Sequence, residues 1–333
     1  MTGLSNIFKF VNGELLQLDE IINSMKIVQP SPESEPSEPI PSNPDPEPQV
    51  DPLNPLGLSP YTIRVKYADG TEPGVNSSSY KLKGAEKTLV DESENIWDVT
   101  YTNADWSSLF FENQNLLAIL GANTSDVTVM GGDKESGIRG CFEECSSLTT
   151  VALFDTSNVT TMERMFVNDT SLTGLPLFDM SNVTTLKYMC YGCSSLTEIP
   201  LFVMPKVESL YGTFEKSGCT NLPALDVPCV SDIENMCRDC YELQSVPLFT
   251  NTDNIESAIF AFINCTNVQS GAFELYQQLS SNAHITHSST FTNCGTSTES
   301  GVADLVQIPV DWGGIDPSSS DDGDGDGDGD DAS

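Results

Sequence analysis

The stretch CSSLTTVALFDTSNVTTMERMF at residues 145–166 is one copy of a unit that recurs about every 24 residues. CSSLTEIPLF at 193–202 repeats the first ten residues of that copy, CSSLTTVALF at 145–154, with the same CSSL start and the same Leu-Phe end. Three apolar columns run in step with the unit: Leu148, Leu172 and Leu196; Leu153, Leu177 and Leu201; Val159, Val183 and Val207. Self-similarity at this period, with an L-x-x-L-x-L core, is typical of a leucine-rich-repeat solenoid.

Each unit is predicted to contain a strand and a short helix. LTEIPLF at 196–202 has apolar residues at i, i+3 and i+5, which indicates a strand in a parallel sheet, and Pro200 keeps it short because proline donates no ladder hydrogen bond. Ser157-Asn158 then supplies a helix cap, and the apolar residues at 159, 162, 165 and 166 follow helical spacing. We therefore predict an α/β repeat, a solenoid of short parallel strands and short helices, over residues 116–316. One unit cannot bury its apolar face alone, so all three columns are expected to line a shared core.

Ten cysteines accompany the repeat, and five of them share one position, three residues before the first Leu or Val of the next unit. These are Cys145, Cys193, Cys219, Cys240 and Cys265. The CxxC pairs at 190–193 and 237–240 suit zinc, but they lie two units apart, about 10 Å at ~4.8 Å per unit. We predict buried, reduced thiols, with disulfides between neighbouring column members and a metal site as the alternatives.

Composition divides the rest of the chain. Residues 61–115 begin with the alternating YTIRVKY and are predicted to form a β-containing cap. Residues 29–60 are predicted to form an acidic linker. Residues 30–60 contain eleven prolines, six carboxylates and no Lys or Arg, which is typical of a polyproline-type spacer. Residues 317–333 are rich in Asp and Gly and are predicted to be a disordered tail. The tail lacks the bidentate Glu of an EF-hand loop, so it supports at most weak association with Ca²⁺.

Residues 1–28 are apolar-rich and are predicted to anchor the chain. After Asn12-Gly13, the residues Leu15, Leu18, Ile22 and Met25 follow the a/d spacing of a coiled-coil seam. We expect a helix that binds a larger particle or sister chains, with a homotrimer as the sister-chain arrangement. The alternative is a helix folded back on the repeats, which the Pro-rich linker disfavours because it would hold the two apart.

Charge and residue usage exclude several function classes. With 14 Lys and Arg against 49 Asp and Glu, the net charge is −35, so phosphate backbones and anionic lipids repel the chain, and we expect no nucleic-acid partner. No window approaches the ~18 apolar residues of a membrane span, and residues 1–10 lack the pattern of a signal peptide, so we expect neither membrane insertion nor ordinary export. His284 and His287 share one loop, and no catalytic motif is present. We therefore predict no catalytic residues, no metal and no cofactor.

The units resemble the BspA-type leucine-rich repeat. The resemblance covers about residues 96–314 and rests on CSSL, SNVT and the Met and Phe at fixed offsets. That family is common in surface proteins of gut anaerobes and mollicutes, and in structural proteins of phages of gut bacteria. The resemblance implies a solenoid used for adhesion or recognition without catalysis. Cellular members usually carry a signal peptide or lipobox, and more units than the five or six counted here.

From the resemblance and the order of the segments we expect a virion-displayed recognition protein, a head or tail fibre or decoration made in the host cytoplasm. Residues 1–28 would bind capsid or tail proteins, and the solenoid would bind a protein or glycan ligand on a cell surface. The alternative is a bacterial cell-surface adhesin or secreted effector. The sequence does not identify the ligand, since solenoid specificity depends on exposed side chains.

Overall fold

The protein is a mixed α/β chain with short strands and few helices in the part that the computed structural model describes, residues 8–11, 14–17, 51–75 and 78–319. It divides into two compact units, Met1–Gln49 and Val50–Ser333.

The first unit contains a hairpin where we predicted a helix. Strands β1 (Phe8–Val11) and β2 (Glu14–Gln17) pair antiparallel, with Val11 opposite Glu14. Leu15 of the predicted seam therefore lies in a strand, while Leu18, Ile22 and Met25 lie outside the described residues. The helix prediction is wrong at Leu15 because Asn-Gly between two apolar runs favours a two-residue hairpin connection, and two heptads are too short to make a helix stable.

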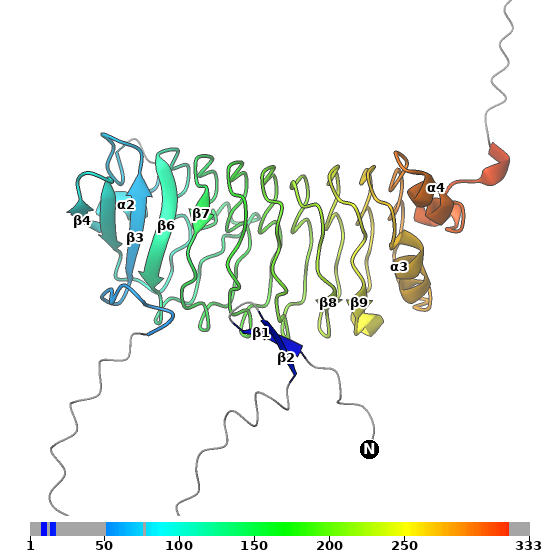
Figure 1. Ribbon diagram of the computed structural model, residues 1–333, viewed down its shortest axis with the longest axis horizontal. Coiled ribbons are helices and arrows are strands. Elements are labelled where there is room, and N and C mark those ends of the chain that lie inside the picture. The colour runs from blue at the N-terminus through cyan, green and yellow to red at the C-terminus, as the bar shows by residue number, and fades with distance from the viewer. Residues whose placement is uncertain (1–7, 12–13, 18–50, 76–77, 320–333) are drawn as a thin grey trace, which may run out of the picture. The chain divides into compact units, whose positions relative to one another are not determined.

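The second unit begins with a five-stranded sheet (Figure 1). Its strands are β3 (Thr62–Tyr67), β4 (Glu86–Asp91), β5 (Ile96–Thr100), β6 (Leu116–Asn123) and β7 (Thr150–Val151), in the order β4-β5-β3-β6-β7. The pairs are antiparallel except β6–β7, which is parallel. Because β7 belongs to the first repeat, the sheet leads directly into the repeats. The short helix α2 (Tyr80–Gly84) is capped by the Ser79 hydroxyl, which accepts a hydrogen bond from the Leu82 amide.

The packed unit starts earlier than the linker boundary that we predicted at residue 60. Leu58 is buried, and its carbonyl accepts hydrogen bonds from the side-chain amides of Asn123 (2.8 Å) and Asn54 (3.0 Å). The end of the Pro-rich stretch therefore packs on β6, because an apolar side chain flanked by amide donors can be buried with its backbone satisfied.

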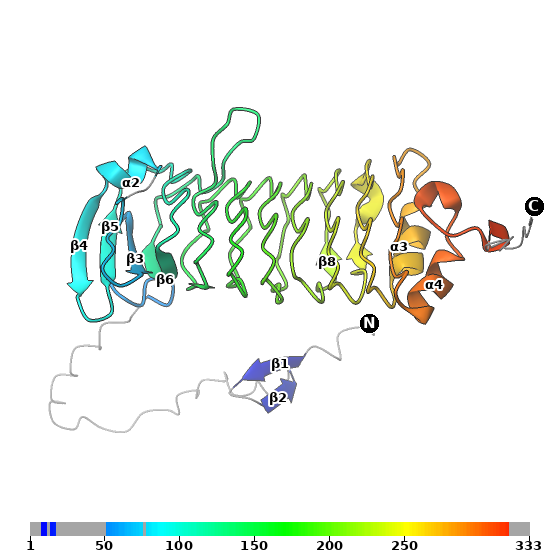
Figure 2. The same cartoon turned by 90° about the horizontal axis from the view of Figure 1, so that it is seen from above.

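The repeats form a row of coils that lie side by side, which we call the coil stack (Figures 1 and 2). Residues one repeat apart pair as parallel bridges, and the longest series joins eight positions: Asp105, Val129, Thr161, Thr185, Ser209, Asp232, Ser257 and Thr286. Strands β8 (Leu225–Asp226) and β9 (Phe249–Thr250) are also parallel neighbours. Each coil therefore takes its backbone partners from the coils on either side.

The helix predicted within each unit is absent from residues 159–166, which contain a bridge at Thr161 and turns from residue 163 onward. The Arg164 and Phe166 amides donate to the carbonyls of Lys187 and Met189 in the next coil, both at 2.9 Å, while the Met165 amide donates back to Met162 at 3.2 Å. Alternate amides thus bond to the neighbouring coil, so no i→i−4 ladder forms. The helical prediction was wrong because tight turns also bring residues three and four apart onto the same side.

The core contains two of the three predicted columns. Both the Leu148 and the Val159 columns are buried along their predicted length: Leu148, Leu172 and Leu196; Val159, Val183 and Val207. The third column is wrong, since Leu153, Leu177 and Leu201 are 40%, 58% and 59% exposed. The next residue of each unit is buried instead: Phe154, Phe178 and Phe202.

The reason is a period of three in the extended segments. Leu196, Ile199 and Phe202 are all buried, as are Leu148 and Phe154 of an earlier coil. A period of three is that of polyproline II, which suits segments that contain proline, whereas the predicted i, i+3, i+5 spacing assumed a strand. Leu201 is therefore turned out of the core by one residue step.

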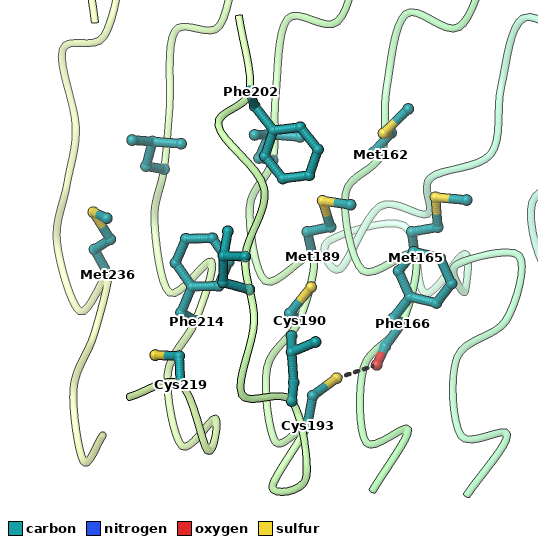
Figure 3. Close-up of a cluster of buried hydrophobic side chains, with 14 of the residues drawn as sticks. Met162, Met165, Phe166, Met189, Cys190, Cys193, Phe202, Phe214, Cys219 and Met236 are labelled. Carbon is teal, nitrogen blue, oxygen red and sulfur yellow. Dashed lines mark hydrogen bonds between the residues drawn. The ribbon is translucent and has the colours of Figure 1, made fainter. Parts of the chain in front are cut away.

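Nine of the ten cysteines are buried, and all ten are free thiols; Cys229 is exposed. Four of the five column thiols donate to carbonyls of the preceding coil, as Cys193 Sγ does to Phe166 O at 3.0 Å (Figure 3) and Cys240 Sγ does to Phe214 O at 2.9 Å. The fifth, Cys219, accepts a hydrogen bond from the Ser217 hydroxyl. Burial raises the pKa of the Cys193 and Cys240 thiols. A thiol at this position therefore fills an apolar column and also satisfies a buried backbone acceptor.

We expect a maleimide to label one thiol in the native chain, because only Cys229 is exposed to the reagent and the other nine thiols are buried. In denaturant all ten should react, and the masses of the adducts count them. The Cys229→Ser variant should give no rapid native label. Rapid native labelling of several thiols would contradict the burial of the column.

Asp169 occupies the cysteine column position in the coil between Cys145 and Cys193. It is fully buried; its Oδ1 accepts a hydrogen bond from the Cys145 amide at 2.7 Å, and its Oδ2 has no partner among the described residues. Burial raises the pKa of this carboxyl well above its usual range, and the neighbouring Cys193 adds to the rise.

Asp169→Asn should stabilise the protein increasingly as pH rises. A carboxyl whose pKa is higher in the folded than in the unfolded protein stabilises the folded state at pH values below its unfolded pKa. This stabilisation is lost as pH rises toward the folded pKa, and the free energy of unfolding then falls by at most about 1.4 kcal/mol per pH unit. Urea unfolding of both proteins between pH 4 and pH 8 measures the difference. Parallel stability curves would contradict a raised pKa at Asp169.

The stack is closed by the helices α3 (Ala272–Leu279) and α4 (Glu299–Leu305) (Figure 1). The described 3₁₀ turns are η1 (Thr252–Asn254), η2 (Val310–Trp312) and η3 (Pro317–Ser319). Trp312 is buried at this end, where the His287 ring stacks on it with centroids 4.0 Å apart; His284 is exposed. The two histidines therefore lie in the C-terminal cap, where one of them packs against an aromatic ring.

Candidate functional site

The turn that follows the buried Val of each coil presents side chains at four repeat positions, those four, five, eight and nine residues after the Val. In four successive coils the fifth residue has a positive φ: Arg164 (62°), Tyr188 (55°), Gly212 (57°) and Asn235 (54°). The ninth does so as well: Asn168 (60°), Gly192 (73°), Lys216 (59°) and Asp239 (58°). Left-handed backbone costs a non-glycine residue about 1–2 kcal/mol, and the hydrogen bonds between coils offset that cost here.

These positions stack into a groove of about 470 Å³ that crosses the coils. We call it the tyrosine groove. It is lined by Lys134, Arg139, Glu144, Arg164, Val167, Asn168, Tyr188, Tyr191, Tyr211, Glu215, Asn235 and Arg238. A second hollow of about 630 Å³ shares Lys134, Tyr188 and Tyr211 with it and extends to Lys187. The loop at 131–140, the teal-green loop that projects from the coils in Figure 2, supplies Lys134.

Three half-buried tyrosines form the aromatic part of the groove. The Tyr188 ring meets Tyr211 edge to face with centroids 5.2 Å apart, and it meets Tyr191 in the same way at 5.9 Å. Gly212 makes room for this cluster, because a Cβ there would lie 2.8 Å from two carbons of the Tyr188 ring. Other residues adopt the positive φ at this repeat position, but the close approach to the Tyr188 ring requires glycine, so Gly212 positions Tyr188.

Lysine side chains lie against two of these rings. Lys134 Nζ lies 4.5 Å from the Tyr188 centroid and donates to its hydroxyl at 3.0 Å. Lys216 Nζ lies 5.0 Å from the Tyr191 centroid and donates to its hydroxyl at 2.8 Å. A lysine held in this way is attracted by the ring and keeps its remaining N–H donors for other groups.

A buried ion cluster supports the floor of the groove. The Glu143 carboxylate is fully buried and accepts hydrogen bonds from Arg164 Nε (3.0 Å), from Arg139 Nη1 (3.0 Å) and from the Gly140 amide (2.9 Å). Arg164 also donates to Glu143 through Nη2. Two guanidinium groups on one carboxylate leave an excess of positive charge at this point.

Arg238 and two carboxylates are less completely paired. Arg238 Nε is buried without a hydrogen-bond partner among the described residues, and the nearest carboxylate oxygens, of Asp239 and Glu215, lie 3.5 and 4.0 Å away. The carboxylates of Glu144 and Glu215 accept no hydrogen bond from the described residues; Lys216 Nζ lies 3.8 Å from Glu215. Desolvation raises the pKa of both carboxyls. The groove therefore holds donors and acceptors that are free to bind something else.

The position of this groove is unusual for so acidic a chain. Six of the 14 Lys and Arg lie at the groove and its adjoining hollow: Lys134, Arg139, Arg164, Lys187, Lys216 and Arg238. Beyond residue 87 the only other cation in the sequence is Lys206. Lys and Arg side chains are thus concentrated at one surface of a protein whose net charge is −35, with the carboxylates of Asp133, Glu135, Glu144, Glu163 and Glu215 among them.

The sequence analysis did not identify any of these residues. The residues it proposed, the Leu, Val and Cys columns, are structural: most are buried, and the Leu153 column is exposed. A signal was present, since scarce cations and tyrosines recur at four repeat positions of consecutive units. The recurrence indicates a binding site only once the structure shows that these positions line a groove.

The described part of the chain contains neither a metal-binding cluster nor a membrane-spanning helix. Within residues 51–75 and 78–319 and the hairpin, no three His, Cys, Asp or Glu residues come together in a way that could hold a metal ion. No helix in these same ranges has the length and apolar character needed to cross a bilayer.

Comparison with known families gave one match. The model of a family described as "Mycoplasma protein of unknown function, DUF285" matches residues 84–172 and 136–270, together more than half of the chain. The matched region contains all residues that line the tyrosine groove. Comparison with curated proteins and with solved structures gave no match.

Proposed function

Since the chain belongs to the DUF285 family of surface-protein-like repeat proteins, we propose that it is a non-enzymatic recognition protein that presents a BspA-type leucine-rich-repeat solenoid to a ligand on a cell surface. The observation that carries this proposal is the tyrosine groove. It combines three tyrosines with partly unpaired charged groups on a stack of coils joined by backbone hydrogen bonds. Tyr and Arg on a rigid surface are the residues that contribute most to binding in protein interfaces.

We propose the virion as the place of display, with the chain acting as a head or tail fibre or decoration. The division into two compact units supports a separate anchor, because residues 1–28, which include the β1–β2 hairpin, lie in a different unit from the coil stack. In this proposal residues 1–28 bind capsid or tail proteins, alone or as a homotrimer. The alternative is a bacterial cell-surface adhesin or secreted effector, and the family description names a bacterium, Mycoplasma.

Cell binding tests the recognition role. Fluorescently labelled full-length chain should remain on intact bacterial or epithelial cells, and the Tyr188→Ala/Tyr211→Ala variant should lose most of that retention. Leu177→Ser is the matched control, since Leu177 is exposed on the coil stack but does not line the groove. Equal retention of all three proteins would contradict a binding role for the groove.

Fractionation with an antibody against the chain tests the location. Signal on purified particles that disappears when residues 1–28 are deleted supports the virion proposal. Signal on washed cell envelopes supports the adhesin alternative. A chain found only free in the cytoplasm would contradict both.

A further inference from the structure

We propose that the tyrosine groove binds an acidic oligosaccharide, a sugar chain that carries carboxylate groups. This inference rests on the proposed recognition function and names the chemical class of its ligand. Three properties of the groove lead to it: the exposed ring surfaces, the unpaired donors and the unpaired acceptors.

The tyrosine cluster offers surfaces for sugar rings. Tyr188 meets Tyr191 and Tyr211 edge to face, so the three rings do not cover one another, and all three remain half-exposed. The electron-rich face of an aromatic ring attracts positively polarised C–H groups, which one side of a sugar ring presents in a row. The hydroxyls of Tyr188 and Tyr191 are held by Lys134 and Lys216, so both rings are fixed before a ligand arrives.

The cations select a negative group on the ligand. Arg238 Nε lacks a hydrogen-bond partner, and Lys216, an exposed side chain one repeat position away, keeps N–H donors that its bond to Tyr191 does not use. A guanidinium and an ammonium on one surface match a carboxylate, which accepts strong charge-assisted hydrogen bonds. A neutral sugar would offer Arg238 only uncharged oxygen acceptors, which form weaker hydrogen bonds than a carboxylate does.

Two carboxylates that accept no hydrogen bond from the described residues distinguish a sugar from an acidic peptide. Glu144 and Glu215 line the same groove, and desolvation already raises their pKa values. A run of Asp or Glu would place further carboxylates beside them and be repelled. Sugar hydroxyls instead donate hydrogen bonds to these acceptors, while the sugar carboxylate binds Arg238 and Lys216. An acidic sugar therefore satisfies both kinds of group.

The charge of the rest of the molecule sharpens this selection. The chain carries −35 overall, so a negative ligand is repelled from most of its surface. At the groove the six cations offset the neighbouring carboxylates, and Arg238 and Lys216 attract a negative group locally. Binding should therefore weaken as salt screens the attraction.

Calorimetry on the full-length chain tests the proposal with two matched pairs of probes: trigalacturonate against its methyl ester, and sialyllactose against lactose. In 20 mM salt we expect at least one acidic probe to bind about tenfold or more tightly than its neutral partner, the contribution of one charge-assisted hydrogen bond. Raising the salt to 300 mM should reduce that difference.

Two variants locate the site. Arg238→Gln and Lys216→Gln should each remove most of the preference for the acidic probe, and Lys206→Gln, at the one cation beyond residue 87 that lies away from the groove, should keep it. Because Arg238 and Lys216 are partly exposed, both variants should keep the thermal unfolding midpoint of the parent, which shows that they fold. Gly212→Ala should weaken the binding of both probes of a pair, since the added methyl group displaces the Tyr188 ring.

Several results would overturn the proposal. These are no binding of either acidic probe at 10 mM, equal binding within both pairs, or a preference that survives both glutamine variants. Tighter binding of hexaglutamate than of any sugar would assign the groove to an acidic peptide instead. Cell retention that depends on Tyr188 but not on Arg238 or Lys216 would leave the recognition function standing and reject the acidic sugar.

Discussion

Phe166→Ala should lower the free energy of unfolding by about 3–5 kcal/mol, the usual loss for a large aromatic residue in a packed core. Phe166 is fully buried, and its ring stacks on Phe142 at 5.5 Å and on Phe178 at 6.4 Å. Its side chain contributes to the core of more than one coil, and the coils are stable only through their neighbours, so a cavity here weakens several of them. Urea unfolding at neutral pH measures the effect.

Leu177→Ala is the matched control for this prediction. Both changes delete an apolar side chain from adjacent coils, but Leu177 is 58% exposed, so the loss should stay below about 1 kcal/mol. The same reasoning applies to Leu201, which the sequence placed in the core. If Leu177→Ala and Phe166→Ala destabilised the protein equally, the inward period of three residues would be wrong.

Glu143→Ala should destabilise the protein by about 3–5 kcal/mol, because it leaves Arg164 with an unpaired charge in a nearly buried place. The Arg164 side chain is 12% exposed, and Glu143 is its carboxylate partner at hydrogen-bond distance. The loss of Glu143 also leaves the Gly140 amide without its acceptor, where the projecting loop rejoins the coils. Thermal and urea unfolding both report this change.

Two controls separate the ion cluster from a general effect of charge. Glu135→Ala removes an exposed carboxylate from the same loop and should change stability by less than about 0.5 kcal/mol. Glu143→Gln combined with Arg164→Met removes both charges and should recover much of the loss, since a buried pair replaced by uncharged groups leaves no unpaired charge. A double variant as unstable as Glu143→Ala would assign the loss to packing rather than to charge.

The tyrosine groove was only partly accessible to sequence reasoning. Arg164, Tyr188 and Gly212 occupy the same repeat position, so the period alone would place them in neighbouring coils. Their presentation depends on a left-handed backbone at that position, where the sequence pattern predicted a helix. Lys134 belongs to the projecting loop, outside any repeat column, so its hydrogen bond to Tyr188 follows from no spacing.

The N-terminal hairpin shows a different reason for a wrong prediction. Leu15 and Ile22 fit a heptad, and Asn12-Gly13 fits a turn, so two local patterns competed for the same residues. Strands form where the structure describes the chain, because β1 and β2 satisfy each other's backbone groups, while two heptads of an isolated helix are too few to offset the cost of nucleation.

By itself the sequence determined the repeat and its buried columns. Residues such as Leu148, Leu172 and Leu196 must be buried by stacking, because a unit of about 24 residues has too little core of its own. Only the tertiary structure decided which neighbours of those columns face inward and which face the groove. That choice depends on hydrogen bonds between coils, as between Arg164 and Lys187, which hold backbone conformations that the local sequence does not favour alone.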